Sequence, residues 1–289
     1  MKETFLAFFS LLLLGSVLSC SGSVNILETF AKKDTDQAKY FQAKLLIDES
    51  KFDEAVTVLL TTSTEFQAES EYKTLLASAY AGKGGLTFLT LVENIKNASS
   101  TRLFPFLLSA FRSGTAANVT NLALAEDVIE TISTDPALRT EDENTLMILV
   151  SFAKIGNYLS AYMDVADGDG NVDAGFADVC VNADSPGTSI DNTSVGEIGI
   201  SLFKILNIIP QLSNNFIANV VGNFGNCTSV EDIGDPLDPL NPLDGMCSVT
   251  DPAGFTALQM FGLRSLLKES SSLGLGISCT GDITTCRCP

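Results

Sequence analysis

Apolar residues recur every three or four positions through much of residues 36–163, which predicts a series of amphipathic helices. The clearest segments are 43–59, 101–114, 116–134 and 135–164. The last of these opens with Asp-Pro and a run of acidic residues, as is typical of a helix start. We expect its apolar stripe to lie in the core, and the stripe consists of Leu146, Leu149, Val150, Ala153, Tyr158 and Tyr162.

Two of these segments share a pattern at an offset of 34 residues. Residues 43–59 and 77–93 both begin with a small residue, Ala43 or Ala77, followed by larger apolar positions. Residues 36–95 therefore resemble the tetratricopeptide repeat, a helix–turn–helix unit of this length. The second unit departs from the family in its glycine-rich turn, and neither unit has the usual tryptophan or closing proline. The resemblance implies an α-solenoid with a surface for a protein partner.

The second half of the chain predicts two more helices, at 195–227 and 255–274, the first of them kinked near Pro210. Lys204 interrupts the apolar stretch, so we do not expect it to span a membrane. Between the helices, residues 235–245 repeat Asp/Asn-Pro-Leu with a period of three, the period of polyproline II. A stapled structural loop and a proline-rich binding motif are both open interpretations of this segment.

Six cysteines lie in the second half, and an even number can pair completely in an oxidising compartment. Six cysteines allow fifteen pairings, so the sequence leaves their connectivity open. We expect the neighbours Cys286 and Cys288 to bind different partners, because one intervening residue suits a mutual bond poorly. The candidate disulfide residues are Cys180, Cys227, Cys247, Cys279, Cys286 and Cys288.

The predicted fold class is all-α. Residues 36–163 are expected to form a tetratricopeptide-like α-solenoid or helical bundle, and residues 164–289 an acidic, disulfide-rich helical region with loops. The formal net charge of −18 is uneven, since residues 156–289 hold 4 basic and 16 acidic residues. Such a chain repels phosphate backbones, which disfavours nucleic-acid binding.

The chain has no histidine, the usual general base near neutral pH and a frequent metal ligand. Serine–histidine and cysteine–histidine triads are therefore excluded, as are most zinc hydrolase sites. A carboxylate-dependent hydrolase would need two buried acids in one cleft, and the spacing shows no such pair. We expect that the protein is not an enzyme.

The first residues have the layout of a secretory signal, with Lys2 ahead of an apolar run from Phe5 to Leu14. This run is about half the ~20 residues that a membrane-spanning helix needs. The following Val-Leu-Ser-Cys resembles the lipobox of bacterial lipoproteins. That resemblance implies that residues 1–19 are removed, that Cys20 carries a diacylglycerol, and that residues 20–35 are a tether. Ser21, where an aspartate would favour the inner membrane, points to the outer membrane.

An acidic loop follows the predicted helix 135–164 and resembles an EF-hand loop in two registers. The register that starts at Asp167 supplies five oxygen ligands, but Val172 stands where glycine is usual. The register that starts at Val165 places Gly170 correctly and loses the first and last ligands, with Asp164 one residue away. An acidic turn without an ion is equally open. The candidate calcium ligands are Asp167, Asp169, Asn171, Asp173 and Asp178.

These patterns predict a lipid-anchored, non-enzymatic protein of the cell envelope, held to the outer membrane through Cys20. Its helical repeats would act as a scaffold for a protein partner. The alternative is a binding lipoprotein that holds a small apolar ligand for solute uptake. A deep apolar pocket would favour the alternative, and a long exposed polar groove would favour the scaffold.

Overall fold

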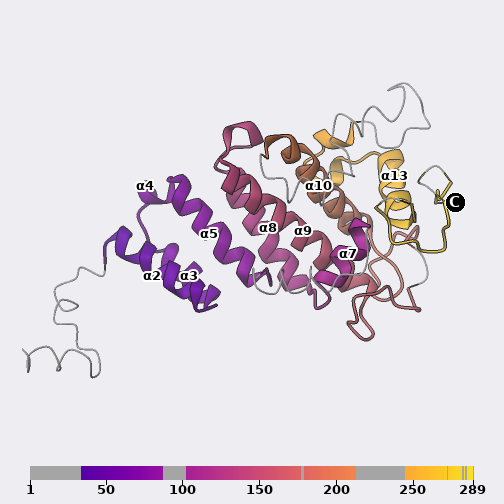
Figure 1. Ribbon diagram of the computed structural model, residues 1–289, viewed down its shortest axis with the longest axis horizontal. Coiled ribbons are helices and arrows are strands. Elements are labelled where there is room, and N and C mark those ends of the chain that lie inside the picture. The colour runs from indigo at the N-terminus through magenta and orange to yellow at the C-terminus, as the bar shows by residue number, and fades with distance from the viewer. Residues whose placement is uncertain are drawn as a thin grey trace, which may run out of the picture.

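Most helices of this chain are stacked side by side in the order of the sequence (Figure 1). The computed structural model describes residues 34–86, 102–176, 179–212 and 245–288, apart from 272, 282 and 284. The α-helices are α2 (Asp36–Asp48), α3 (Phe52–Leu59), α4 (Thr64–Gln67), α5 (Ser70–Lys83), α7 (Leu103–Ala110), α8 (Ala116–Glu130), α9 (Glu141–Met163), α10 (Asn192–Ile208) and α13 (Ala257–Lys268). The 3-10 helices are η2 (Pro136–Leu138), η3 (Ile209–Gln211), η5 (Met246–Ser248) and η6 (Pro252–Gly254).

No β-strand occurs in the described ranges, where Ser185 and Ser189 form an isolated β-bridge. The all-α prediction is confirmed at this level. Helix α2 packs on α3, α3 on α5, α5 on α8, α8 on α9 and α9 on α10, and α7 lies against α9. In Figure 1 the α2–α3 pair occupies one end of the stack and α13 the other.

The long helix α9 begins later than its sequence pattern predicted. Residues 136–138 form the separate element η2, and α9 starts after Thr140. The hydroxyl of Thr140 accepts a hydrogen bond from the Glu143 N–H, and the Glu143 carboxylate accepts one from the Thr140 N–H. This reciprocal capping box satisfies two helix-end donors and so fixes the start of α9.

Helix α9 is buried on almost every side. Among the six residues of its predicted stripe, Val150 and Ala153 are fully buried, and the other four are partly buried. The prediction was incomplete because α7, α8 and α10 pack on different sides of α9. The buried surface of α9 is therefore wider than a single apolar stripe. The additional fully buried apolar residues are Met147, Ile148, Ile155, Leu159 and Met163.

Among the described helices, α9 is also long and apolar enough to cross a membrane. Its most apolar 18-residue window is 72% buried by neighbouring helices. Core helices of this kind satisfy the same length and hydropathy criteria, so this observation is weak support for a membrane span.

Two clusters of apolar side chains hold the stack together. The smaller joins α2, α3 and α5 and includes Ala43, Leu59 and Tyr72. The larger extends from Ala77 to Leu273 and thus includes residues on both sides of position 163. Packing is therefore continuous from α5 to α13 within the described residues.

The α2–α3 pair has the helix–turn–helix form that the repeat resemblance implies, with Ala43 and Ala55 fully buried. In the second unit, Ala77 is also fully buried on α5. Residues 87–93, which would form the second helix of that unit, lie outside the described residues. The tetratricopeptide assignment stays a prediction.

Helix α10 ends where the sequence predicted a kink. The helix covers Asn192–Ile208, and Pro210 lies in η3, which follows directly. Proline lacks the N–H that a continuing helix needs, which accounts for the stop. Residues 213–244, with the predicted continuation to 227 and the Asp-Pro-Leu repeat, lie outside the described residues.

Candidate functional site

Three helices bring five charged residues together in and beside the core. Glu126 and Glu130 come from α8, Lys154 from α9, and Glu197 and Lys204 from α10. We call these five residues the buried charge cluster. Positions 126 and 130 are four residues apart, so they share one face of α8.

Glu126 is the centre of the buried charge cluster and is 1% exposed. Its Oε2 lies 2.9 Å from Nζ of Lys154 and 3.0 Å from Nζ of Lys204. Its Oε1 accepts hydrogen bonds from the hydroxyls of Ser151, at 2.8 Å, and Ser201, at 3.2 Å. Both carboxylate oxygens are therefore satisfied, as burial of a charge requires.

The two lysines each bind a second carboxylate nearer to solvent. Nζ of Lys154 lies 2.6 Å from Oε2 of Glu197, and Nζ of Lys204 lies 2.8 Å from Oε1 of Glu130. Burial alone would raise the pKa of Glu126, but the charges of Lys154 and Lys204 lower it to about 2. Burial would likewise lower the pKa of Lys154, and the Glu126 and Glu197 charges raise it instead. Glu126 and Lys154 are therefore both charged near neutral pH, which does not suit general acid–base catalysis.

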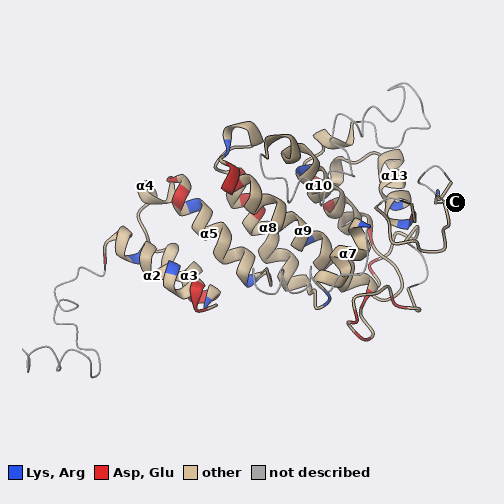
Figure 2. Cartoon of the chain, in the orientation of Figure 1, with Lys and Arg blue, Asp and Glu red and all other residues tan. Residues whose placement is uncertain are grey.

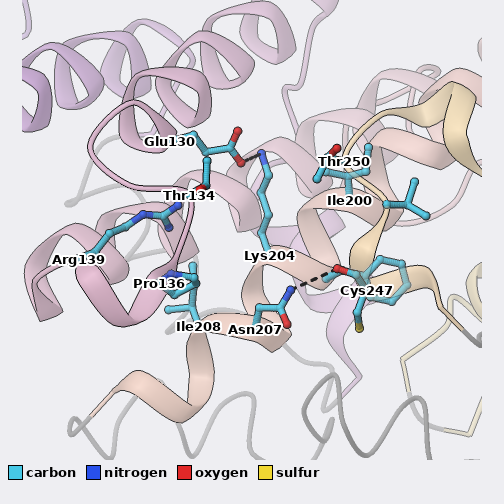
Figure 3. Close-up of a pocket in the computed structure, with 12 residues that line it drawn as sticks. Glu130, Thr134, Pro136, Arg139, Ile200, Lys204, Asn207, Ile208, Cys247 and Thr250 are labelled. Carbon is cyan, nitrogen blue, oxygen red and sulfur yellow. Dashed lines mark hydrogen bonds and ion pairs between the residues drawn. The ribbon is translucent and has the colours of Figure 1, made fainter.

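A small cavity of about 110 Å³ opens beside Lys204, between the end of α8, η2, α10 and the segment after η5 (Figure 3). Figure 3 shows Lys204 directed at Glu130, and Asn207 Nδ2 donating to the Cys247 carbonyl oxygen over 3.4 Å. Typical ligand pockets measure about 300–1,000 Å³. This cavity therefore has room for a few atoms only. Its lining residues are Glu130, Thr134, Pro136, Arg139, Ile200, Phe203, Lys204, Asn207, Ile208, Cys247, Val249 and Thr250.

The acidic loop after α9 is held by hydrogen bonds from its own backbone. Asp164, which is 4% exposed, accepts from the N–H groups of Asp169, at 3.1 Å, and Gly170, at 2.8 Å. Asp173 Oδ2 accepts from the N–H groups of Val165 and Ala166, at 2.7 and 2.9 Å. These bonds fold the loop back on the end of α9.

This folding brings Asp164, Asp167 and Asp173 together, with one carboxylate oxygen from each within 4.8 Å of the others. Burial, followed by the charges of Asp169 and Asp173, raises the pKa of Asp164, while two backbone N–H groups oppose that rise. Three such oxygens are the ligand type that calcium prefers.

The three clustered carboxylates are not the same as the predicted set of calcium ligands. Asp167 and Asp173 belong to both sets, and Asp164, which was not among the predicted ligands, joins them. Asp169 directs Oδ1 to the Asn171 N–H over 2.8 Å, so Asp169 and Asn171 hold the loop locally. Asp178 lies outside the described residues.

The cysteines of the second half form one long-range and one short-range pair among the described residues. Cys180 pairs with Cys288 at a Cα–Cα distance of 5.3 Å, and Cys279 pairs with Cys286 at 5.6 Å. The expectation that Cys286 and Cys288 bind different partners is confirmed. Cys247 is also disulfide-bonded. The predicted lipidation residue Cys20 and the candidate disulfide residue Cys227 lie outside the described residues.

A buried arginine reinforces the same region. Arg264 of α13 is 4% exposed and donates to the Ile190 carbonyl over 3.0 Å and to the Asn192 side chain over 2.6 Å. It also donates to the Val179 carbonyl, next to Cys180. Arg264 therefore connects α13 with the loop between α9 and α10.

The buried charge cluster was not predicted, although the sequence contains a signal for it. Lys154 and Lys204 stand alone in the apolar runs Ser-Phe-Ala-Lys-Ile and Leu-Phe-Lys-Ile-Leu. A lysine surrounded by apolar residues in a helix interior requires a carboxylate partner if it is buried. That partner is Glu126, 28 residues before Lys154 and 78 before Lys204.

No family model matches this chain, and neither the curated proteins nor the solved structures contain a significant match. The case for a function therefore comes from the arrangement of the residues themselves.

Proposed function

We propose that this protein is a lipid-anchored helical scaffold of the cell envelope, non-enzymatic and attached through Cys20. The observation that carries the proposal is the packing of α2, α3, α5, α8, α9 and α10 against one another in chain order. Stacks of this kind present their outer helix faces as extended binding surfaces. The lipobox-like sequence before Cys20 supports the anchor, and the outer membrane is its proposed location.

The buried charge cluster supports a structural role more than a chemical one. Its carboxylates and ammonium groups are mutually paired, and Glu126 and Lys154 are at most 3% exposed. Paired groups of this kind fix which faces of α8, α9 and α10 meet, a role that polar core residues have in some helical assemblies. A scaffold needs helices in fixed positions, because its partner binds a surface of defined shape.

The alternative, a carrier of a small apolar ligand, has less support. The cavity beside Lys204 is about 110 Å³ and is lined by charged as well as apolar side chains. A carrier needs a larger and more apolar cavity than this one. Two larger hollows in the described residues, of about 310 and 520 Å³, are more open and are lined by polar as well as apolar residues, the second by the acidic loop after α9. A bound apolar ligand of ten or more heavy atoms, detected by native mass spectrometry of the purified protein, would favour the carrier.

Two measurements on one preparation test the scaffold. Intact mass of the membrane-extracted protein is expected to show residues 1–19 removed and acyl chains on Cys20, and a Cys20→Ser variant should remain unacylated. Cross-linking in intact cells, followed by quantitative mass spectrometry, is expected to enrich one envelope protein reproducibly with the wild type. The anchor would be contradicted if Cys20 is unacylated in the wild type and the Cys20→Ser variant enriches the same protein.

A further inference from the structure

The cavity beside Lys204 is lined by an arginine that forms no ion pair in the described part of the chain. Arg139 follows η2, and its Nε donates to the Ser133 carbonyl oxygen over 2.7 Å. This is the one hydrogen bond that its side chain makes among the described residues. Figure 3 shows the nitrogen end of Arg139 directed toward Thr134, which also lines the cavity. The two terminal nitrogens of the guanidinium therefore remain available to a ligand.

The carboxylates near Arg139 bind other groups. Glu130 forms an ion pair with Lys204. Glu143 belongs to the capping box of α9, and Asp135 caps the start of η2. Burial lowers the pKa of Arg139, and the charges of these three carboxylates offset that effect only in part. A half-buried cation of this kind gains from an anionic partner.

The uncharged side chains that line the cavity are mostly apolar. Ile200, Phe203 and Ile208 are each at most 4% exposed. A cavity of roughly 150 Å³ holds a six-carbon ring, so the 110 Å³ of this cavity suits about four or five non-hydrogen atoms. A ligand with one anionic group and a short apolar part would match both kinds of lining, whereas inorganic phosphate would match Arg139 alone.

The acidic groups of the chain leave this part of the stack accessible to an anion. The acidic loop after α9 lies at the other end of that helix from η2, and α9 has 23 residues and is about 34 Å long (Figure 2). The buried charge cluster carries one net negative charge, but none of its carboxylates forms an ion pair with Arg139. Glu130 is the acidic member of the lining, and its ion pair with Lys204 weakens its repulsion of an anion.

We propose that this cavity binds a small monocarboxylate with a short aliphatic tail. The carboxylate accepts hydrogen bonds from the terminal nitrogens of Arg139, in the two-pronged geometry that guanidinium and carboxylate groups share. The tail packs against Phe203 and Ile208. This site is independent of the anchor at Cys20 and adds a ligand to the proposed scaffold. Because α8, η2, α10 and the segment after η5 all border the cavity, the bound acid links these four elements.

Propionate is the probe for this proposal, and propionamide is its uncharged isostere. Each is titrated into the purified full chain at constant ionic strength, and binding is detected by saturation-transfer NMR of the ligand methyl group. We expect propionate to bind at millimolar concentration, several-fold more tightly than propionamide or inorganic phosphate. Propionate should also raise the melting temperature relative to the same concentration of sodium chloride, because it binds the folded chain.

Three variants locate the bound acid. Arg139→Gln should weaken propionate binding at least several-fold, because it removes the cation. The matched control is Arg112→Gln, since Arg112 lies at the end of α7 and its Nε also donates to a backbone carbonyl, that of Ser109, over 3.2 Å. This control should bind propionate as the wild type does. Glu130→Gln removes the opposing carboxylate and should strengthen binding several-fold.

Equal binding of propionate and propionamide would show that the charge is not recognised, and tighter binding of phosphate would show that the apolar lining is not used. Either result would overturn the proposal. Unchanged binding in a folded Arg139→Gln variant, or unchanged or weaker binding in Glu130→Gln, would place the acid elsewhere and overturn it as well. If circular dichroism shows that Arg139→Gln is unfolded, the Glu130→Gln titration decides. None of these outcomes bears on the acylation of Cys20.

Discussion

Nζ of Lys154 lies 2.9 Å from Oε2 of Glu126, and neither side chain is more than 3% exposed. The two residues come from adjacent helices and meet in the core of the stack. Removing two charges from water costs free energy that their attraction offsets only when the remaining hydrogen bonds are made. Ser151 and Ser201 supply those bonds, so the pair specifies how α8, α9 and α10 pack.

Removal of the Glu126 charge should destabilise the protein strongly. In Glu126→Gln, Lys154 and Lys204 lose their shared carboxylate and keep only Glu197 and Glu130. We expect the free energy of unfolding, measured by urea denaturation, to fall by about 3 kcal/mol. The control is Glu130→Gln, at the partly exposed rim of the same cluster, which should cost less than about 1 kcal/mol. Equal losses in the two variants would contradict a special role for the buried position.

The Glu126–Lys154 pair should show energetic coupling. Glu126→Gln leaves Lys154 underpaired, and Lys154→Met leaves Glu126 with Lys204 alone. In the double variant neither charge of this contact remains. The free energy of unfolding of the double variant should therefore fall by less than the sum of the two single decreases, with a difference of roughly 1–3 kcal/mol. Urea denaturation of the four proteins in the cycle gives the coupling. Strict additivity would show that the two charges do not act together.

Stability should depend on pH in an acidic range that Glu126 sets. The pKa of Glu126 is about 2 in the folded chain, against an ordinary value of 4.5. The unfolded chain therefore takes up a proton at a higher pH than the folded chain does. The stabilisation from ionised Glu126 is present above pH 4.5 and is lost as the pH falls toward 2, by about 3 kcal/mol in total.

Thermal denaturation between pH 5 and pH 2 measures this dependence. Other carboxylates titrate in the same range, so Glu126→Gln is the reference: its stability should fall less steeply below pH 4.5. Parallel curves for the two proteins would show that Glu126 keeps an ordinary pKa when folded.

The Cys180–Cys288 pair should contribute more stability than Cys279–Cys286. The first joins residues 108 positions apart and the second only 7. In the chain-entropy model, a bond that closes a loop of this length restricts the unfolded chain, which stabilises the folded state by roughly 5 and 2 kcal/mol, respectively. Urea denaturation of Cys180→Ser/Cys288→Ser and Cys279→Ser/Cys286→Ser is expected to preserve this order. A larger loss in the second variant would mean that native contacts, and not chain entropy, decide the effect.

Local patterns in the sequence predicted the helices well, because spacing and helix starts are local. The segment 101–114 contains α7, 116–134 contains α8, and 255–274 contains α13. An error arose where a nearby side chain decides a boundary, since Thr140 starts α9 five residues after the predicted Asp-Pro. Helix α10 ends at Ile208, just before Pro210, and the predicted continuation to 227 lies outside the described residues.

The candidate site was less accessible to sequence reasoning, because its residues are far apart along the chain. Glu126 meets Lys204 across 78 positions, and no periodicity encodes that contact. The acidic loop shows a related limit. Its composition indicated a cation site, but backbone hydrogen bonds to Asp164 and Asp173 decide which carboxylates meet.

Calcium should stabilise the loop after α9 if its three clustered carboxylates bind an ion. Asp164, Asp167 and Asp173 place oxygens within 4.8 Å of one another, and a divalent cation would relieve their repulsion. We expect calcium to raise the melting temperature of the wild type and a chelator to reverse the rise. Asp167→Asn should abolish the response, because it removes a clustered charge.

The matched control is Asp169→Asn, in the same loop but outside the cluster. The geometry predicts that this variant keeps the calcium response, whereas the predicted EF-hand register requires its loss. Retention in Asp169→Asn with loss in Asp167→Asn supports the observed cluster, and the reverse pattern supports the register. An unchanged melting temperature in all three proteins would show that the loop is an acidic turn, stabilised by its backbone hydrogen bonds alone.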